Sequence, residues 1–191
     1  MKTNHMTKKF VLAALLLLLN VTGTYAQKLD GTWVAGTTFQ NLVKKAMDED
    51  SEMPNLGVNM TFKGSQFVPC FRITHGDEEM SIDMEVWAQG TCLRKGDKVN
   101  TFVDPSKAQL KVISLTTTDE DANVLLGTEA GRKLIYAALE EKVKEENLLQ
   151  DLSPFWDLFK TFEVKAVTTN KLIIDVEGTE LDFDRVADRK W

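Results

Sequence analysis

Apolar and polar residues alternate with a period of two through most of this chain, and no other feature limits its fold as strongly. The alternation is clearest from Ile82 to Cys92 and returns around Val58–Phe62 and Leu172–Val176. A period of two places successive side chains on opposite faces of a β-strand. The pattern predicts about nine short antiparallel strands, which fit an up-and-down barrel better than a two-layer fold. We expect residues 82–92 to form one long strand that bends at Gly90 as it crosses the barrel wall.

Two segments depart from this period. The first strand, which we expect at Leu29–Phe39, is followed by helical spacing of apolar residues over 39–47. The second departure is an insertion at about residues 119–159, which is rich in good helix formers. Asp119 or Thr128 is a suitable N-cap for it. The sequence therefore predicts a mainly β, antiparallel up-and-down barrel, with a short helix after the first strand and a longer helical insertion before the last three strands.

The N-terminus has the three parts of an export signal. Three lysines precede an apolar run of ten residues, Phe10–Leu19, and an A-x-A-like cleavage site ends at Ala26. The run is too short to span a bilayer, and no later apolar run is long enough either. We expect residues 1–26 to be a signal peptide that is cut before Gln27, which makes the protein periplasmic or extracellular. Residues 27–191 are predicted to form one domain.

Charge and histidine content exclude several partners. Cleavage would remove three of the 23 basic residues and none of the 29 acidic ones, which takes the formal charge from −6 to −9. An acidic chain lacks the basic patch that neutralises phosphates, so we expect neither nucleic acid nor an anionic membrane as a partner. The one histidine beyond the signal, His75, lies in a His-Gly-Asp turn, and no metal-ligand spacing occurs. We therefore expect no metal and no cofactor.

The protein has two cysteines, Cys70 and Cys92, and export would place them in an oxidising compartment that permits a disulfide. Pro69 interrupts the strand that carries Cys70, so we expect an edge or a bulge there. A hairpin centred near residue 77 would pair Cys70 with about Met84 and not with Cys92. The pattern therefore favours two separate thiols over a disulfide, and no cationic neighbour stands at an offset that would activate Cys92.

The two ends of the mature chain carry a resemblance to a known family. Gly31-Thr32-Trp33 opens the first strand, and Arg185 lies on the apolar face of the last one. In both respects the chain resembles the lipocalin or calycin group, in particular lipocalin-like exported bacterial barrels. The resemblance implies that Trp33 plugs one end of the barrel and that the guanidinium of Arg185 lies across its ring, an attraction of about 1–2 kcal/mol.

No catalytic signature accompanies this pattern, and we expect no enzyme. A Ser-His-Asp arrangement would have to use His75, which lies in a turn without orienting residues. The neighbouring carboxylates Asp182 and Asp184 lie on the solvent side of their strand.

Inward-facing residues are the remaining functional candidates. A barrel of about eight strands either holds one small apolar ligand or fills its interior with side chains. Our leading hypothesis is an exported lipocalin-like protein that binds a small hydrophobic molecule. The alternative is a structural or interaction module of the cell envelope with a filled core, which contacts another envelope protein. The candidate cavity lining comprises Met60, Phe62, Phe67, Phe71, Ile82, Met84 and Val86, and the barrel closure comprises Gly31, Trp33 and Arg185.

Overall fold

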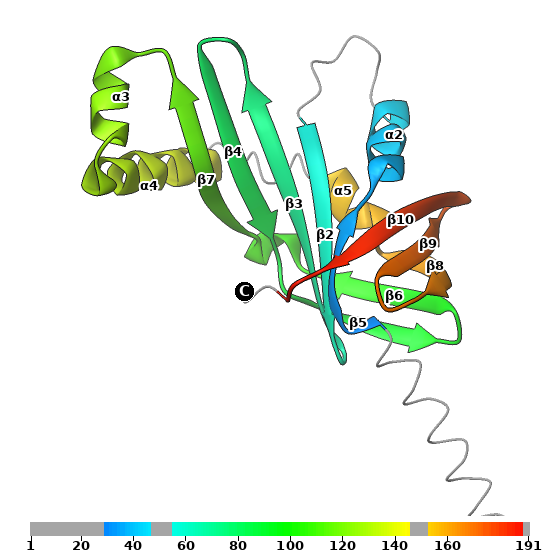
Figure 1. The fold of residues 1–191 in the computed structure, drawn as a ribbon. Coiled ribbons are helices and arrows are strands. Elements are labelled where there is room, and N and C mark those ends of the chain that lie inside the picture. The colour runs from blue at the N-terminus through cyan, green and yellow to red at the C-terminus, as the bar shows by residue number, and fades with distance from the viewer. Residues whose placement is uncertain (1–28, 47–54, 146–152, 189–191) are drawn as a thin grey trace, which may run out of the picture.

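The computed structural model describes residues 29–46, 55–145 and 153–188, so the predicted signal peptide lies outside the described residues. Ten strands and four longer helices follow one another along these segments (Figure 1). Their bounds are β1 (Gly31–Ala35), α2 (Thr37–Ala46), β2 (Asn55–Lys63), β3 (Gln66–Gly76), β4 (Met80–Trp87), β5 (Gly90–Lys95), β6 (Lys98–Val103), the 3-10 turn η1 (Pro105–Lys107), β7 (Gln109–Thr117), α3 (Glu120–Leu126), α4 (Glu129–Glu145), α5 (Ser153–Leu158), β8 (Thr161–Val167), β9 (Lys171–Val176) and β10 (Thr179–Val186).

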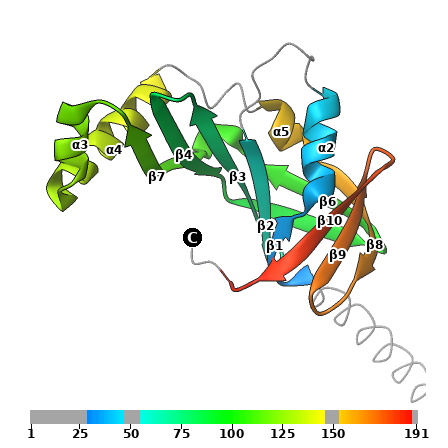
Figure 2. The ribbon, with the colours of Figure 1, turned by 45° about the horizontal axis from the view of Figure 1, so that its top comes forward.

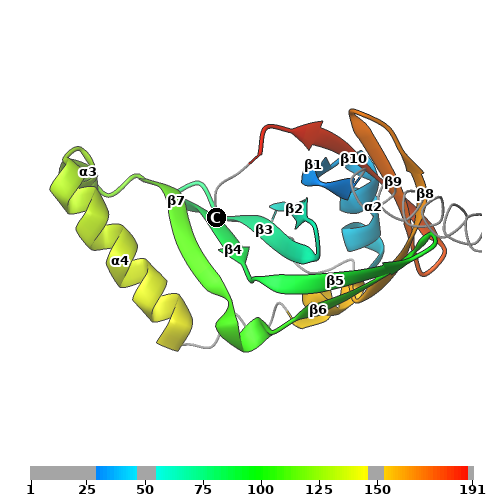
Figure 3. The same ribbon diagram turned by 90° about the horizontal axis from the view of Figure 1, so that it is seen from below.

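Eight of these strands close into an antiparallel barrel, which confirms the predicted fold. The sheet runs β2-β1-β10-β9-β8-β6-β5-β3, and β3 pairs again with β2. The first and last strands meet directly, with Trp33 opposite Arg185. Seen from below in Figure 3, α2 lies within the outline formed by β1, β10, β9 and β5. We call these eight strands the ring.

Two strands lie outside the ring, so the prediction of one long strand over residues 82–92 is wrong. This segment divides into β4 and β5, and only β5 belongs to the ring. β4 pairs with the outer half of β3 and with β7, and together they form a flat extension to the left of the barrel in Figure 1. We call β4, β7 and the outer half of β3 the side sheet.

Pro69 marks the point where the side sheet leaves the ring. Residues 66 and 67 of β3 pair with β5, whereas residues 70–76 pair with β4. Between these two pairings, Val68 and Pro69 have no strand partner on that edge. A proline has no N–H to donate, so it fits the position where a strand changes partner. The irregularity expected at Pro69 is therefore a change of partner and not a bulge.

The helical insertion covers the outer edge of the side sheet. Asp119 caps α3 by accepting from Ala122 N, and Thr128 Oγ1 accepts from Gly131 N at the start of α4. Both predicted caps are used because the insertion contains more than one helix. Figure 2 shows α3 and α4 beside β7, where the side chain of Glu140 accepts from Val112 N at 2.9 Å. Because Glu140 occupies this backbone donor, part of the β7 edge is protected from association with other strands.

The first strand is shorter than predicted. β1 ends at Ala35, and Thr37 and Phe39 belong to α2. Gly36 N donates to Asp182 O at 2.8 Å, which ends the pairing with β10, and Asp182 N then donates to Thr38 Oγ1 at 3.0 Å. The chain turns into the helix at this point, and Phe39 is buried in the core from α2 instead of from a strand.

Candidate functional site

Aromatic rings pack against one another inside the ring. Phe62 lies 5.1 Å from Phe67 and 6.4 Å from Phe162 between ring centroids. All three side chains are fully or almost fully buried. They belong to one apolar cluster that joins β2, β3 and β8 across the barrel. Contacts of this kind are those of a packed protein interior.

The predicted cavity lining divides between the ring and the side sheet. Met60, Phe62, Phe67 and Phe71 come from β2 and β3 and are buried in the central cluster. Ile82, Met84 and Val86 come from β4, which is not a strand of the ring. Val86 is fully buried, whereas Ile82 and Met84 are half-buried. The structure therefore brings together the first four residues and Val86, with Met84 packed against the edge of the same cluster, whereas Ile82 does not belong to it.

One end of the ring is closed by α2 and α5. The rings of Phe39 and Phe159 stack with centroids 6.3 Å apart, and Phe71 meets the indole of Trp156 edge to face at 4.8 Å. The sequence analysis placed Trp156 and Phe159 within the helical insertion at about residues 119–159 and missed this role. The available signal was three aromatic residues at positions 155, 156 and 159, the spacing of one face of a helical turn.

Trp33 and Arg185 lie opposite each other at the seam between β1 and β10. The guanidinium carbon of Arg185 lies 5.4 Å from the centroid of the Trp33 ring, and its Nη2 donates to Asp30 O at 2.7 Å. Trp33 is fully buried, and its Nε1 donates to Leu29 O at 2.7 Å. Gly31 has a φ of +130°, and a Cβ there would lie 2.8 Å from Arg185 Nη2. Only glycine leaves room for the guanidinium at this point.

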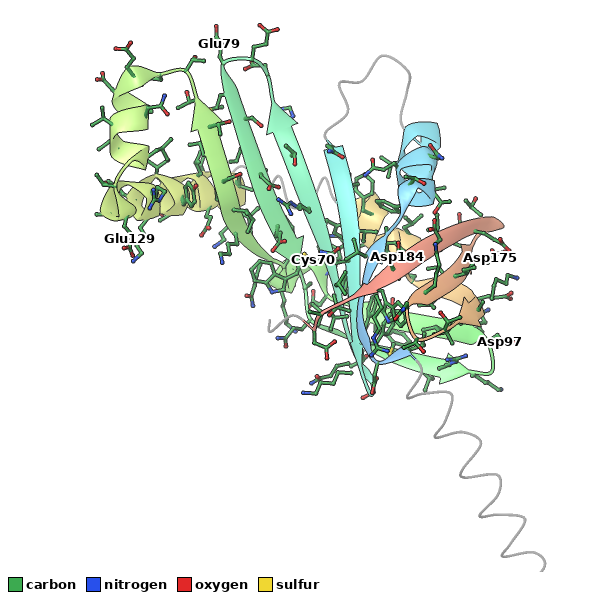
Figure 4. The ribbon with its side chains drawn as sticks, in the orientation of Figure 1. Cys70, Glu79, Asp97, Glu129, Asp175 and Asp184 are labelled. Atoms are coloured by element: carbon green, nitrogen blue, oxygen red, sulfur yellow. The ribbon has the colours of Figure 1, made fainter. Side chains whose placement is uncertain are left out.

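The two cysteines are not joined by a disulfide, as the sequence favoured. Cys70 is buried on β3 opposite Trp87 of β4, near the base of the side sheet in Figure 4. Cys92 is half-buried on β5, and its burial, together with the charge of Asp30, raises the pKa of its thiol. A raised pKa lowers the thiolate fraction at neutral pH, so Cys92 is a poor nucleophile.

The outer face of the side sheet carries one partly buried ion pair. Arg72 Nε donates to both carboxylate oxygens of Asp83 at 3.0 and 3.1 Å, and Thr74 adds a longer contact. The hydrogen bond from Arg72 lowers the pKa of Asp83, although burial opposes it. The Arg72 side chain is 50% exposed. This arrangement pins β3 to β4 and presents no reactive group.

Two grooves lie on the outside of the ring beside α5. The first has a volume of about 630 Å³ and lies between β6, η1 and α5; we call it the β6 groove. The second, of about 680 Å³, continues along β8 and shares Asp157, Lys160 and Thr161 with the first. The side chains that line the β6 groove are Asn100, Thr101, Phe102, Val103, Pro105, Trp156, Asp157, Lys160 and Thr161.

In the described part of the chain, no three His, Cys, Asp or Glu side chains gather into a site for an ion. Among the same residues, no helix is both long and apolar enough to cross a membrane.

Comparisons with known proteins do not assign this chain to a protein family. No protein-family model matches this chain, and no curated protein matches it either. The closed eight-stranded antiparallel barrel is compatible with a calycin-like fold.

Proposed function

We propose that this protein is an exported, non-enzymatic interaction module of the lipocalin-like kind, which contacts other envelope proteins through its outer surface. The observation that carries the proposal is the packing of Phe62, Phe67 and Phe162 against one another inside the ring. Side chains that fill the interior supply the hydrophobic stabilisation of the domain and leave recognition to the outside.

The shape of the molecule supports the same proposal. The side sheet and its helices extend away from the ring, with Glu79 at the tip and Glu129 at the start of α4 (Figure 4). The insertion exposes Val124 and Leu134, which are 73% and 68% accessible. Contiguous exposed apolar patches mark sites of protein contact, and we propose that these two side chains belong to one.

The leading hypothesis from the sequence, a small hydrophobic ligand inside the barrel, stays a prediction. It requires an opening among side chains that are buried against one another, including Met60 and Phe71. Calycin-like barrels of eight strands can hold one such ligand, so the two functions call for a direct test.

Titration with an apolar fluorescent probe separates the two functions. The purified mature protein is titrated with cis-parinaric acid, and lipids that remain bound after purification are sought by native mass spectrometry. The interaction module is expected to show no retained lipid and no saturable 1:1 binding. Saturable binding that is abolished by Phe67→Trp, which adds bulk to the interior, would refute the proposal. Leu93→Trp serves as the control, since Leu93 is exposed on β5.

A further inference from the structure

We propose that the β6 groove binds an extended, uncharged peptide segment of another protein, which adds to the open edge of β6. This inference rests on the proposed interaction function and names its site and the chemistry of its partner. Three features carry it: the backbone of β6, the side chains beside it, and the charge of the groove.

The backbone of β6 has an edge that β8 covers only in part. Val164 N donates to Asp97 O at 2.7 Å, and Thr101 N donates to Lys160 O at 2.9 Å. Positions 97, 99 and 101 therefore point toward β8, because main-chain groups alternate between the two edges of a strand. By the same alternation, the N–H and C=O of Val103 point to this side. β8 begins at Thr161, which pairs with Asn100, so it supplies no strand partner for Val103.

The β6 groove occupies the place where β8 would have continued. Val103 and Pro105 line it on one side, and Trp156 and Asp157 line it on the other. The chain reaches β8 from α5 instead of along β6, and this route leaves about 630 Å³ beside the strand end. An added peptide can supply both a carbonyl for Val103 N and an N–H for Val103 O. This is the hydrogen bonding of β-strand addition.

One exposed aromatic side chain, that of Phe102, gives the groove an apolar surface. Phe102 is 64% exposed, which is unusual for a side chain of its size on a strand. Trp156 is only 4% exposed, and within the described residues its Nε1 is the one buried side-chain polar atom without a hydrogen-bond partner. The indole packs edge to face against Phe71 in the core, so it lies beneath the groove and supplies no contact to a bound peptide.

The charge of the groove selects an uncharged segment. Asp157 and Lys160 are the only charged residues in its lining, and they form an ion pair with 2.6 Å between Oδ1 and Nζ. The remaining polar side chains are neutral, and Thr161 Oγ1 donates to Asn100 Oδ1 at 3.0 Å. A charged segment would find no unpaired opposite charge here and would lose hydration on binding. The favoured partner therefore has neutral polar and apolar side chains.

The test uses peptides selected on the purified mature protein. A phage library of random octapeptides is panned, and the enriched peptides are synthesised and measured by fluorescence anisotropy. We expect enriched sequences without charged residues. Phe102→Ser should weaken their binding about tenfold. Leu93→Ser is the matched control, because Leu93 is equally exposed at 64% on β5 and lies outside the groove. It should change affinity less than about twofold.

Modified peptides test the backbone contact without changing the protein. A series with one N-methylated amide at each position should contain one peptide that binds about tenfold more weakly, because methylation removes the donor to Val103 O. Binding that is insensitive to Phe102→Ser and to every methylation would overturn the groove while leaving the interaction function intact. Failure to enrich any peptide, together with an apolar probe whose binding depends on Phe102, would also overturn it and identify a small-molecule site. A probe bound inside the ring would instead remove the proposed function.

Discussion

The closure of the barrel at Trp33 makes a quantitative prediction about Trp33→Phe. The smaller ring cannot donate to Leu29 O, a buried hydrogen bond of 2.7 Å whose loss costs about 0.5–1.5 kcal/mol. Its attraction to the Arg185 guanidinium, now at 5.4 Å from the indole, weakens by about 0.5–1 kcal/mol. With the lost apolar area, we expect the free energy of unfolding to fall by about 2–3 kcal/mol.

Trp156→Phe is the matched control for this change. It removes the same part of a buried indole, but the Nε1 of Trp156 has no partner among the described residues. Removing an unsatisfied buried donor recovers about 1–3 kcal/mol and offsets the lost packing. We therefore expect its net cost to be below about 1 kcal/mol.

Urea denaturation followed by far-ultraviolet circular dichroism measures both variants without relying on tryptophan fluorescence. The reasoning requires Trp33→Phe to be the more destabilising of the two by about 1.5 kcal/mol or more. Equal losses would refute it, because they would show that ring size alone matters and that neither the hydrogen bond nor the guanidinium contributes.

Three further predictions concern other parts of the chain. Gly31→Ala should cost about 1–3 kcal/mol in the same denaturation assay, since its φ is +130° and its Cβ would crowd Arg185; a neutral result would show that the seam can relax. The pKa of Asp83 is lowered in the fold, so its contribution to stability is present above about pH 4 and is lost as the pH falls through the lowered value. The free energy of unfolding should therefore change less between about pH 7 and about pH 3 in Asp83→Asn than in the unchanged protein. An equal change in the two proteins would contradict this. Cys70 is buried and the pKa of Cys92 is raised, so both thiols should react with Ellman's reagent about tenfold or more slowly than in urea; fast labelling of Cys92 would argue against its burial.

The closed barrel could be predicted from the sequence because its evidence is local. Alternation marks each strand, and the resemblance to the lipocalin or calycin group, carried by Gly31, Trp33 and Arg185, implied that the two chain ends meet. These residue types constrain backbone conformation and packing directly, so one sequence suffices to identify them.

The side sheet could not be predicted because alternation does not say which strand is the partner. Residues 82–92 keep one period across the break between β4 and β5, because the alternation of side chains reports strand conformation and does not identify the partner strand. Pro69 gave the only local sign of the change of partner, and it is equally consistent with a bulge or an edge.

The β6 groove was also beyond sequence reasoning. It exists because α5 directs the chain away from the end of β6, and that route depends on contacts between Phe71, Trp156 and Phe159 that are distant in sequence. The exposed position of Phe102 is likewise a property of the assembled sheet, because a phenylalanine in a strand is usually assigned to the core.

Xenon binding tests most directly whether side chains fill the barrel, because xenon enters empty apolar cavities without needing a specific ligand. Crystals pressurised with xenon, or xenon-129 nuclear magnetic resonance of the purified protein, would report such a cavity. We expect no xenon site among Phe62, Phe67 and Phe162, whose rings are in contact. A xenon site between these rings would contradict the filled interior. It would favour the other hypothesis, in which the barrel binds a small hydrophobic ligand.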